Sequence, residues 1–408
     1  MKIPDIKLAM IPQGDYAAYR REVIFGAYKW DPQVGDHNTV ARHAVLISRQ
    51  TAAQLEADAE ALSREVLAME AALLGQPQLA KAMGFSRKLC RPLARMGGYR
   101  PQDHVRLMRF DFHPTDNGWA ISEVNSDVPG GLAEAGVLPG KAARFFPGHG
   151  PGKNVAAQMV AAFEGKLPPS GRVAFVHATS YADDRQVMQY LADCFTAKGY
   201  RTMFAAPDHL CWNDGKAVSI LRGEEGPVDA IVRFFPLEWL ANLPAKADWQ
   251  GYFDCQTPSC NHPAAVLTQS KRLPLVWDGL GVDLSAWRAL LPETREPRTI
   301  LAGDADWIYK PAFGRVGEDI SVPGAVTPAE CRKIERAARR QKNSWVAQRL
   351  FHSQPVVDEL GRAFHLCVGA FTLDAKAAGF YARISQSARI DERAQDIPVL
   401  IQKENTDA

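Results

Sequence analysis

Two short stretches of alternating apolar and polar residues carry side chains that could bind a metal–nucleotide complex. Arg109 and Asp111 stand two positions apart in RFDF, and Glu123 and Asn125 stand two positions apart in EVN. Such pairs share one face of a β-strand, and a turn at 114–118, PTDNG, lets both pairs face the same side. Carboxylates with substrate phosphates are typical Mg²⁺ ligands, and the arginine could contact phosphate oxygens. A polar, solvent-facing strand is the alternative interpretation.

A lysine and a glycine-containing loop form a second candidate site. Lys310 ends an apolar strand in YKPAFGRVG and is followed by Gly314, Arg315 and Gly317. A small loop beside a strand-held lysine can close over a triphosphate and donate backbone N–H groups and positive charge. The G-x-x-x-x-G-K-[ST] and G-x-G-x-x-G spacings are both absent, which excludes a Walker loop and a dinucleotide motif. A β-turn with no ligand explains the same residues.

Four further polar side chains stand in segments that we expect to be apolar strands: Arg233 in AIVRFFPLEW, Lys271 in QSKRLPLVW, Gln348 in WVAQRLF and Arg383 in FYARIS. Each of them could also be an ordinary strand-edge residue. Nucleophile motifs such as G-x-S-x-G are absent, and the histidines form no H-E-x-x-H, so the sequence offers little support for a hydrolase. Cys255 and Cys260 lack a second pair at zinc-site spacing.

Composition favours a soluble globular protein in the cytoplasm. The 408 residues include 48 Lys and Arg against 46 Asp and Glu, which gives a net charge of +2 and no strong field for a nucleic acid. No segment reaches the roughly 20 apolar residues of a membrane span, and the first residues lack the apolar core of a secretory signal. An odd number of cysteines, seven, without C-x-x-C spacing indicates reduced thiols.

The elements that must position these side chains can be read from periodicity. Helical spacing predicts a long amphipathic helix at 50–74, and alternation predicts a hairpin over 105–127. Repeated Gly and Pro predict a break in regular structure at 128–140, before a helix that starts near Asn154.

The rest of the chain is expected to form two further units. Strands at 172–178, 201–207 and 229–235 with a helix at 183–200 predict a parallel βαβ unit. The last unit is expected to contain, in order, a strand, the glycine loop and a second strand within 304–322, a helix at 327–341, a strand at 344–351, and a strand pair at 364–373 and 377–385.

Seven segments taken in order resemble the landmarks of the glutathionylspermidine synthase family, which belongs to the ATP-grasp ligases. They are RFDF, EVNSDVPGG, FFPLEW, QSKRLPLVW, YKPAFGRVG, VAQRLF and AAGFYARIS, and the match runs from about Lys29 to about Pro398. The resemblance implies an α/β (α+β) ATP-grasp fold with a permuted order of elements and a pre-ATP-grasp-like lobe. It implies three regions: 1–150 with the metal-binding hairpin, 151–290 as the pre-ATP-grasp-like lobe, and 291–408 with the nucleotide-binding lid and the C-terminal part of the core.

The resemblance also assigns roles to the candidate residues. Asp111, Glu123 and Asn125 would hold Mg²⁺, and Arg109 would bind phosphate or an acyl phosphate. Lys271 and Lys310 would hold ATP phosphates under the loop that carries Gly314, Arg315 and Gly317. Gln348 would lie near the adenine, and Arg383 would steady the transferring phosphoryl group.

The implied activity is ATP-dependent joining of a small carboxylate to an amine through an acyl phosphate, with no nucleic-acid or membrane partner. The chain departs from the family at GRVG, where relatives commonly carry SREG, and at SDVPGG, where DTPTS is usual, so that Val316 and Val128 are atypical. YARIS also stands where an Arg-Glu pair is common. Glutathione and spermidine therefore stay open as substrates. The alternatives are a related peptide or amide ligase and a nucleotide-binding protein without catalysis.

Overall fold

A six-stranded antiparallel sheet lies at the centre of the computed structural model, which describes residues 5–30, 32–244, 246–314, 317, 319–341 and 343–404. Its main strands run in the order β21 (Gln395–Ile397), β20 (Lys376–Ser385), β19 (Ala363–Leu373), β5 (Leu107–Thr115) and β6 (Gly118–Asn125), and β18 (Val356–Val357) pairs with β19. The predicted hairpin, now β5 and β6, and the predicted pair, now β19 and β20, are confirmed. Segments far apart in the sequence therefore share one sheet.

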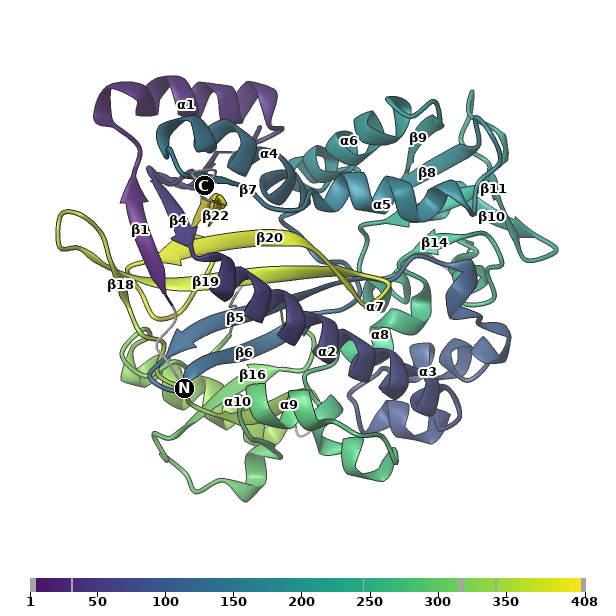
Figure 1. Cartoon of the computed structure of the whole chain (residues 1–408). Helices are drawn as coiled ribbons and strands as arrows, with labels where there is room; N and C mark the ends of the chain where they lie inside the picture. The colour runs from purple at the N-terminus through teal and green to yellow at the C-terminus, as the bar shows by residue number, and fades with distance from the viewer. Residues whose placement is uncertain are drawn as a thin grey trace.

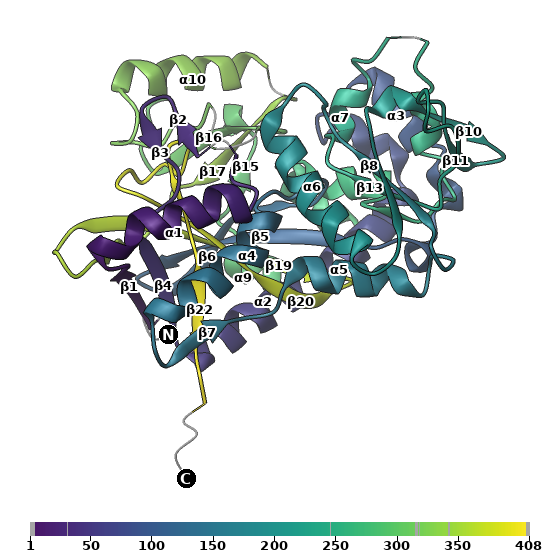
Figure 2. The ribbon, with the colours of Figure 1, turned by 90° about the horizontal axis from the view of Figure 1, so that it is seen from above.

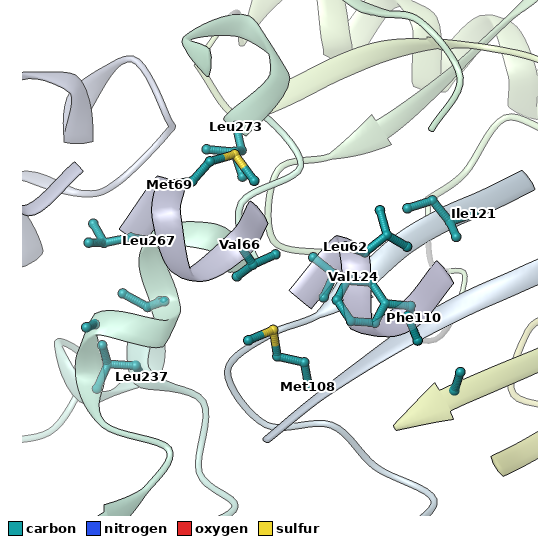
Figure 3. Close-up of a cluster of buried hydrophobic side chains, with 14 of the residues drawn as sticks. Leu62, Val66, Met69, Met108, Phe110, Ile121, Val124, Leu237, Leu267 and Leu273 are labelled. Carbon is teal, nitrogen blue, oxygen red and sulfur yellow. The ribbon is translucent and has the colours of Figure 1, made fainter. Parts of the chain in front are cut away.

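The helix predicted at 50–74 is confirmed as α2 (Arg49–Leu74), which crosses the face of this sheet (Figure 1). Ser48 Oγ caps its first turn by accepting a hydrogen bond from Thr51 N, 3.1 Å away. Its apolar residues recur three or four positions apart and pack on the sheet. Figure 3 shows the contact, in which Leu62 lies beside Phe110 and Val124 of the hairpin, whereas Met69 lies beside Leu273. One hairpin face is thereby buried, which leaves the other face free for polar side chains.

The predicted parallel unit is also confirmed. Its sheet has the order β14 (Ser259–Cys260), β13 (Ala230–Arg233), β8 (Arg172–Val176) and β9 (Arg201–Ala205), with all neighbours parallel. Two helices lie beside this sheet, α5 (Val155–Glu164) and α6 (Ala182–Thr196), as Figure 2 shows from above. Arg233 is not an edge residue, because its guanidinium forms a fully buried ion pair with Asp127. It ties this sheet to the segment that follows the hairpin.

A small sheet forms a third layer, with the order β15 (Thr294–Arg295), β17 (Trp345–Arg349) and β16 (Trp307–Pro311), next to the helix α10 (Pro328–Arg340). The helix and the strands around Lys310 and Gln348 are as predicted. The second strand expected near 320–322 is wrong for the described residues, because only Ser321 bonds to β16, through its N–H and its Oγ at Tyr309.

The remaining described elements complete the chain. A four-stranded sheet has the order β1 (Ile6–Met10), β4 (His43–Ile47), β22 (Val399–Gln402) and β7 (His149–Pro151), and β22 is parallel to β4. The others are β2 (Gln33–Val34), β3 (His37–Asn38), β10 (Leu210–Asn213), β11 (Lys216–Ser219), β12 (Gly226–Pro227), α1 (Gln13–Gly26), α3 (Arg87–Leu93), α4 (Leu132–Ala142), α7 (Leu237–Leu240), α8 (Val266–Gln269) and α9 (Ser285–Leu290), joined by short 3₁₀ turns.

Two further sequence predictions are wrong, and packing explains the first of them. The break expected at 128–140 contains the helix α4, with Pro139 inside it. Leu132 and Leu138 are buried, so packing offsets the weak helix propensity of the glycines and the proline. Lys271 lies on no strand, since it follows α8 and precedes a 3₁₀ turn at 273–275.

Within the described residues, no helix is both long and apolar enough to cross a bilayer.

Candidate active site

A cavity of about 920 Å³ opens where the central sheet meets the parallel sheet and the small sheet. This volume lies near the upper end of the roughly 300–1,000 Å³ of small-molecule sites. Seven of the predicted site residues line the cavity: Arg109, Asp111, Glu123, Asn125, Lys310, Gly317 and Arg383. Lys271 and Gln348 are not among the lining residues but contact Glu123 and Lys310, which are. Gly314 is not among them either, and its backbone oxygen accepts from Lys271. Arg315 lies outside the described residues, as does Val316.

A β-bulge arranges the hairpin face that looks into the cavity. Phe112 pairs with Ile121 and Phe110 with Val124, so β6 has one residue more than β5 between these pairs. The extra residue aims the side chain of Ser122 into the cavity beside Glu123, although strict alternation would point the two apart. The sequence pattern missed Ser122 for this reason.

Arg109 and Asp111 form a fixed two-point ion pair at the cavity wall. Nε and Nη2 of Arg109 donate to the two carboxylate oxygens of Asp111 at 2.7 and 2.9 Å, and its Nη1 donates to Gly130 O at 2.7 Å. The guanidinium also lies 5.0 Å from the centre of the Tyr381 ring. Gly369 on β19 leaves room for it, because a Cβ there would lie 2.6 Å from Arg109 Cδ. The donors of this arginine are therefore satisfied by protein groups.

Glu123 and Lys271 form the second ion pair of the site. Lys271 Nζ lies 2.8 Å from Glu123 Oε2 and donates to Gly314 O at 2.7 Å. Burial raises the pKa of Glu123, but the charge of Lys271 and its hydrogen bond outweigh burial and hold this pKa below its usual value. Glu123 is thus ionised at neutral pH. Lys271 links the hairpin directly to the glycine loop, which is where a phosphate-binding lysine is expected.

Lys310 stands between the small sheet and the hairpin. Its Nζ donates to Gln348 Oε1 at 2.6 Å and to Ser122 O at 3.2 Å, and the residue is 4% exposed. Burial lowers the pKa of Lys310 to about 8, although the charge of Glu123 opposes this shift. Gln348 also donates to Thr294 Oγ1 at 3.3 Å, so its carboxamide is occupied in orienting Lys310. A role for Gln348 at a nucleotide base stays a prediction.

Arg383 enters the cavity from β20. Its Nη2 donates to the backbone oxygen of Asp391 in the loop that follows β20. Burial lowers the pKa of Arg383, but Tyr381 and Asp396 outweigh it and raise this pKa above the usual value. The arginine is therefore a permanent cation in the cavity, on the same face of the central sheet as Asp111.

A second charged cluster in the same cavity was not found in the sequence. Lys29 Nζ lies 3.0 Å from Glu134 Oε1 and 2.8 Å from Asp396 Oδ2, and Tyr381 Oη donates to Asp396 Oδ1 at 2.6 Å. All four side chains line the cavity. They come from four separate segments with no shared motif, so no local signal in the sequence could have predicted them.

The hairpin residues fit a hard cation through the chemistry of their donors. Asp111 and Glu123 offer carboxylate oxygens, and Asn125 donates its Nδ2 to Asp111 Oδ2 at 3.1 Å, which turns its Oδ1 elsewhere. Within the described part of the chain, no three His, Cys, Asp or Glu side chains gather closely enough to hold a metal by themselves. Phosphate oxygens would have to complete the coordination of Mg²⁺, as they commonly do.

Residues 19–402 match the family described as "Glutathionylspermidine synthase preATP-grasp". The chain belongs to this glutathionylspermidine synthase family. The match extends over nearly the whole chain and agrees with the resemblance seen in its motifs.

Two known proteins show similarity to this member of the glutathionylspermidine synthase family. A Haemophilus influenzae protein, provisionally named an acid–amine ligase, is 23% identical over 231 residues, which are 54% of this chain and 56% of that protein. The chain thus matches only about half the length of this curated relative. A glutathione synthetase-like effector from Globodera pallida, solved in the apo form, superposes with a TM-score of 0.62 at 10% identity, over 96% of this chain and 99% of that one. The likeness confirms the predicted ATP-grasp fold class.

Proposed function

We propose that this protein is an ATP-dependent ligase that joins a small carboxylate to an amine through an acyl phosphate. One observation carries the proposal: the two hairpin carboxylates, Lys310 and Arg383 converge on one cavity, although the hairpin and the two other strands are far apart in the sequence. Lys271 pairs with Glu123 and donates to Gly314 O of the glycine loop. A cavity with fixed cations and carboxylates suits a magnesium-bound triphosphate better than an uncharged ligand.

The first step transfers a phosphoryl group. A carboxylate oxygen forms a bond to the γ-phosphorus, the bond from that phosphorus to the β–γ bridging oxygen breaks, and ADP leaves with the electron pair. Lys271 and Lys310 bind the phosphates, and the loop from Gly314 to Gly317 covers them. Arg109 and Arg383 neutralise charge on the transferring group. The protein mainly positions the reactants, since phosphoryl transfer needs little covalent help.

The second step forms the amide. The amine nitrogen attacks the carbonyl carbon of the acyl phosphate, inorganic phosphate leaves with the electron pair of the broken C–O bond, and the nitrogen loses one proton. Excluding water from the cavity protects the acyl phosphate from hydrolysis. The burial of Lys310 and Arg109 at the cavity wall is in keeping with a site that becomes largely dry when the loop covers its ligand.

We assign Mg²⁺ to Asp111, Glu123 and Asn125. When bound, the ion would neutralise charge on the β- and γ-phosphate oxygens. In the structure, Arg109 and Lys271 balance the two carboxylates instead. We infer that these two cations turn towards the phosphates once the metal takes their place.

The substrates proposed first are those in the family name, a glutathione-like carboxylate and a polyamine. Val128, one of the positions that depart from the family pattern, lines the cavity. Because Val128 changes the cavity wall, the alternative proposal is that the substrates are a different peptide-like carboxylate or a different amine. We place the protein in the cytoplasm, since all seven of its cysteines are free thiols.

The experiment is to measure ADP release from Mg·ATP against a panel of carboxylates and amines, with product masses read by mass spectrometry. The proposal predicts ADP release that depends on a carboxylate, and a product whose mass is the sum of acid and amine less one water. Tight Mg·ATP binding with no turnover across the panel would favour a binding protein. Absence of nucleotide binding would reject the proposal.

A further inference from the structure

The loop between β20 and β21 carries an arginine to which the sequence analysis gave no role. Arg389 lines the cavity together with its neighbours Ala388 and Ile390. Its side chain is 22% exposed, so most of a permanent cation is withdrawn from water here. Burying a guanidinium is costly unless good partners compensate it.

The ion-pair partners of Arg389 compensate the burial of its charge poorly. Its Nη2 lies 3.3 Å from Asp391 Oδ2 and its Nη1 lies 3.7 Å from Glu330 Oε1, both longer than the roughly 2.7–2.9 Å of strong charge-assisted bonds. Its Nε is buried and has no hydrogen-bond partner among the described residues. Arg109 in the same cavity, by contrast, satisfies its Nε and both terminal nitrogens at 2.7–2.9 Å. The Nε–H and the weakly paired terminal N–H groups of Arg389 are therefore available as hydrogen-bond donors to a ligand.

Arg389 and Arg383 both contact Asp391. Arg383 Nη2 donates to the backbone oxygen of Asp391, whose carboxylate is the nearer partner of Arg389. Both arginines line the cavity. Asp391 therefore holds the two guanidinium groups in one part of the cavity wall.

Gly317 of the glycine loop packs directly on this arginine loop. A Cβ at Gly317 would lie 2.7 Å from Ile390 O, so the two backbones touch. Glu330, the weak partner of Arg389, belongs to α10 beside the same small sheet. A group held beneath the glycine loop would therefore lie next to Arg389.

We propose that Arg389 acts with Arg383 as a two-arginine oxyanion site for the phosphoryl group during its transfer from ATP to the carboxylate. This inference rests on the proposed function. The two guanidinium groups, together with the hairpin residues that line the same cavity, would hold the equatorial oxygens of the γ-phosphoryl group. Arg389 releases its long contact to Glu330 and turns its unpartnered Nε to those oxygens.

The test compares two nucleotides that differ only beyond the β-phosphate. Affinities for Mg·ADP and for Mg·AMP-PNP are measured by titration calorimetry on the full chain, the wild type and the variants Arg389→Ala, Arg389→Lys and Arg393→Ala. Arg393 is the matched control, because it is an exposed arginine of the same loop. We expect Arg389→Ala to weaken Mg·AMP-PNP by about tenfold or more and Mg·ADP by less than about twofold. Arg389→Lys should recover part of the loss, and Arg393→Ala should match the wild type.

Equal affinities of Arg389→Ala and the wild type for Mg·AMP-PNP would overturn the inference and leave the proposed function standing. Equal losses for both nucleotides would overturn it as well, since they would indicate a general effect on the fold or on nucleotide binding. A wild-type chain that binds neither nucleotide would overturn the inference together with the proposed function.

Discussion

Lys310 illustrates how burial at a binding site tunes one residue. Its ammonium is enclosed by the hairpin and the small sheet, and burial lowers the pKa to about 8. The free protein therefore loses this positive charge just above neutral pH. A bound phosphate would restore the charged form, so nucleotide binding should be coupled to proton uptake.

We predict uptake of ~0.5–1 proton per nucleotide at pH 8.5, where the free lysine is mostly neutral, and weaker nucleotide binding as the pH rises from 7 to 9. Calorimetry in two buffers of different ionisation enthalpy measures the uptake. Gln348→Glu is the matched control, because a carboxylate at the same acceptor position raises the pKa of Lys310 and should remove the uptake. The same uptake in both proteins would contradict this role for Lys310.

A second prediction concerns Asp111, whose carboxylate is assigned to the metal. Asp111→Asn keeps the shape of the side chain but removes its charge, so ATP turnover should fall about a hundredfold or more. Asp116→Asn, in the exposed hairpin turn, is the control and should keep full turnover. Steady-state ADP release together with thermal unfolding separates lost chemistry from lost folding. Normal turnover in Asp111→Asn would indicate that the carboxylate of Asp111 has no part in catalysis.

The polar pairs of the hairpin could be predicted because strand alternation alone decides which side they face. Ser122 could not, since the bulge that redirects it depends on pairing with a neighbouring strand. The contact of Gln348 with Lys310 was also missed, because it joins side chains on two strands whose register the sequence does not reveal. Arg389 lies in a loop without periodicity, where alternation gives no information.

Gly317 in the glycine loop makes one close backbone contact. Gly317 has a φ of +69°, and a Cβ there would lie 2.7 Å from Ile390 O. Any side chain would strain the loop and push it away from the arginine loop. The contact explains why a glycine stands at this position.

Gly317→Ala should therefore raise the KM for ATP by about tenfold, with a small loss of stability. Gly324→Ala is a matched control, because Gly324 also has a positive φ, +83°, but nothing lies within 4 Å of its Cβ position. It shares the backbone strain and lacks the clash. If the two variants shifted the KM for ATP equally, the contact with Ile390 would have no part in binding.

At the same scale, elements with strong local periodicity were predictable and those fixed by packing were not. The spacing of apolar residues in α2 and the strand–helix–strand order of β8, α6 and β9 each indicated their structures. The helix α4 was hidden by its glycines and by Pro139, whose cost the burial of Leu132 and Leu138 offsets. The second strand after the glycine loop failed because a single residue, Ser321, supplies the whole pairing.

Across the whole molecule, pairing between distant segments builds the cavity. β5 pairs with β19, and β22 lies between β4 and β7, so early and late parts of the chain depend on each other. Local patterns contain no information on such partners, which is why the cavity itself could not be predicted without the family resemblance. The extents of the three proposed regions, 1–150, 151–290 and 291–408, stay predictions.

A substitution of Leu400 tests whether the early and late parts of the chain stabilise each other. It is fully buried on β22, and Leu400→Ala should lower the free energy of unfolding by about 2–5 kcal/mol. Gln402→Ala, on an exposed residue of the same strand, should change it by less than about 0.5 kcal/mol. Urea unfolding followed by circular dichroism measures both. A negligible loss for Leu400→Ala would indicate that β22 adds little to the packing of the N-terminal strands.

The central claim is that a metal–nucleotide complex binds between the hairpin and the small sheet. A crystal structure of the protein with Mg²⁺ and AMP-PNP tests it most directly. The account predicts a metal bound by oxygens of Asp111, Glu123 and Asn125 and by phosphate, with Lys271 and Lys310 on the phosphates and Arg383 at the γ-phosphoryl group. A nucleotide bound elsewhere, or phosphates that touch neither lysine while the hairpin stays paired as it is now, would contradict it.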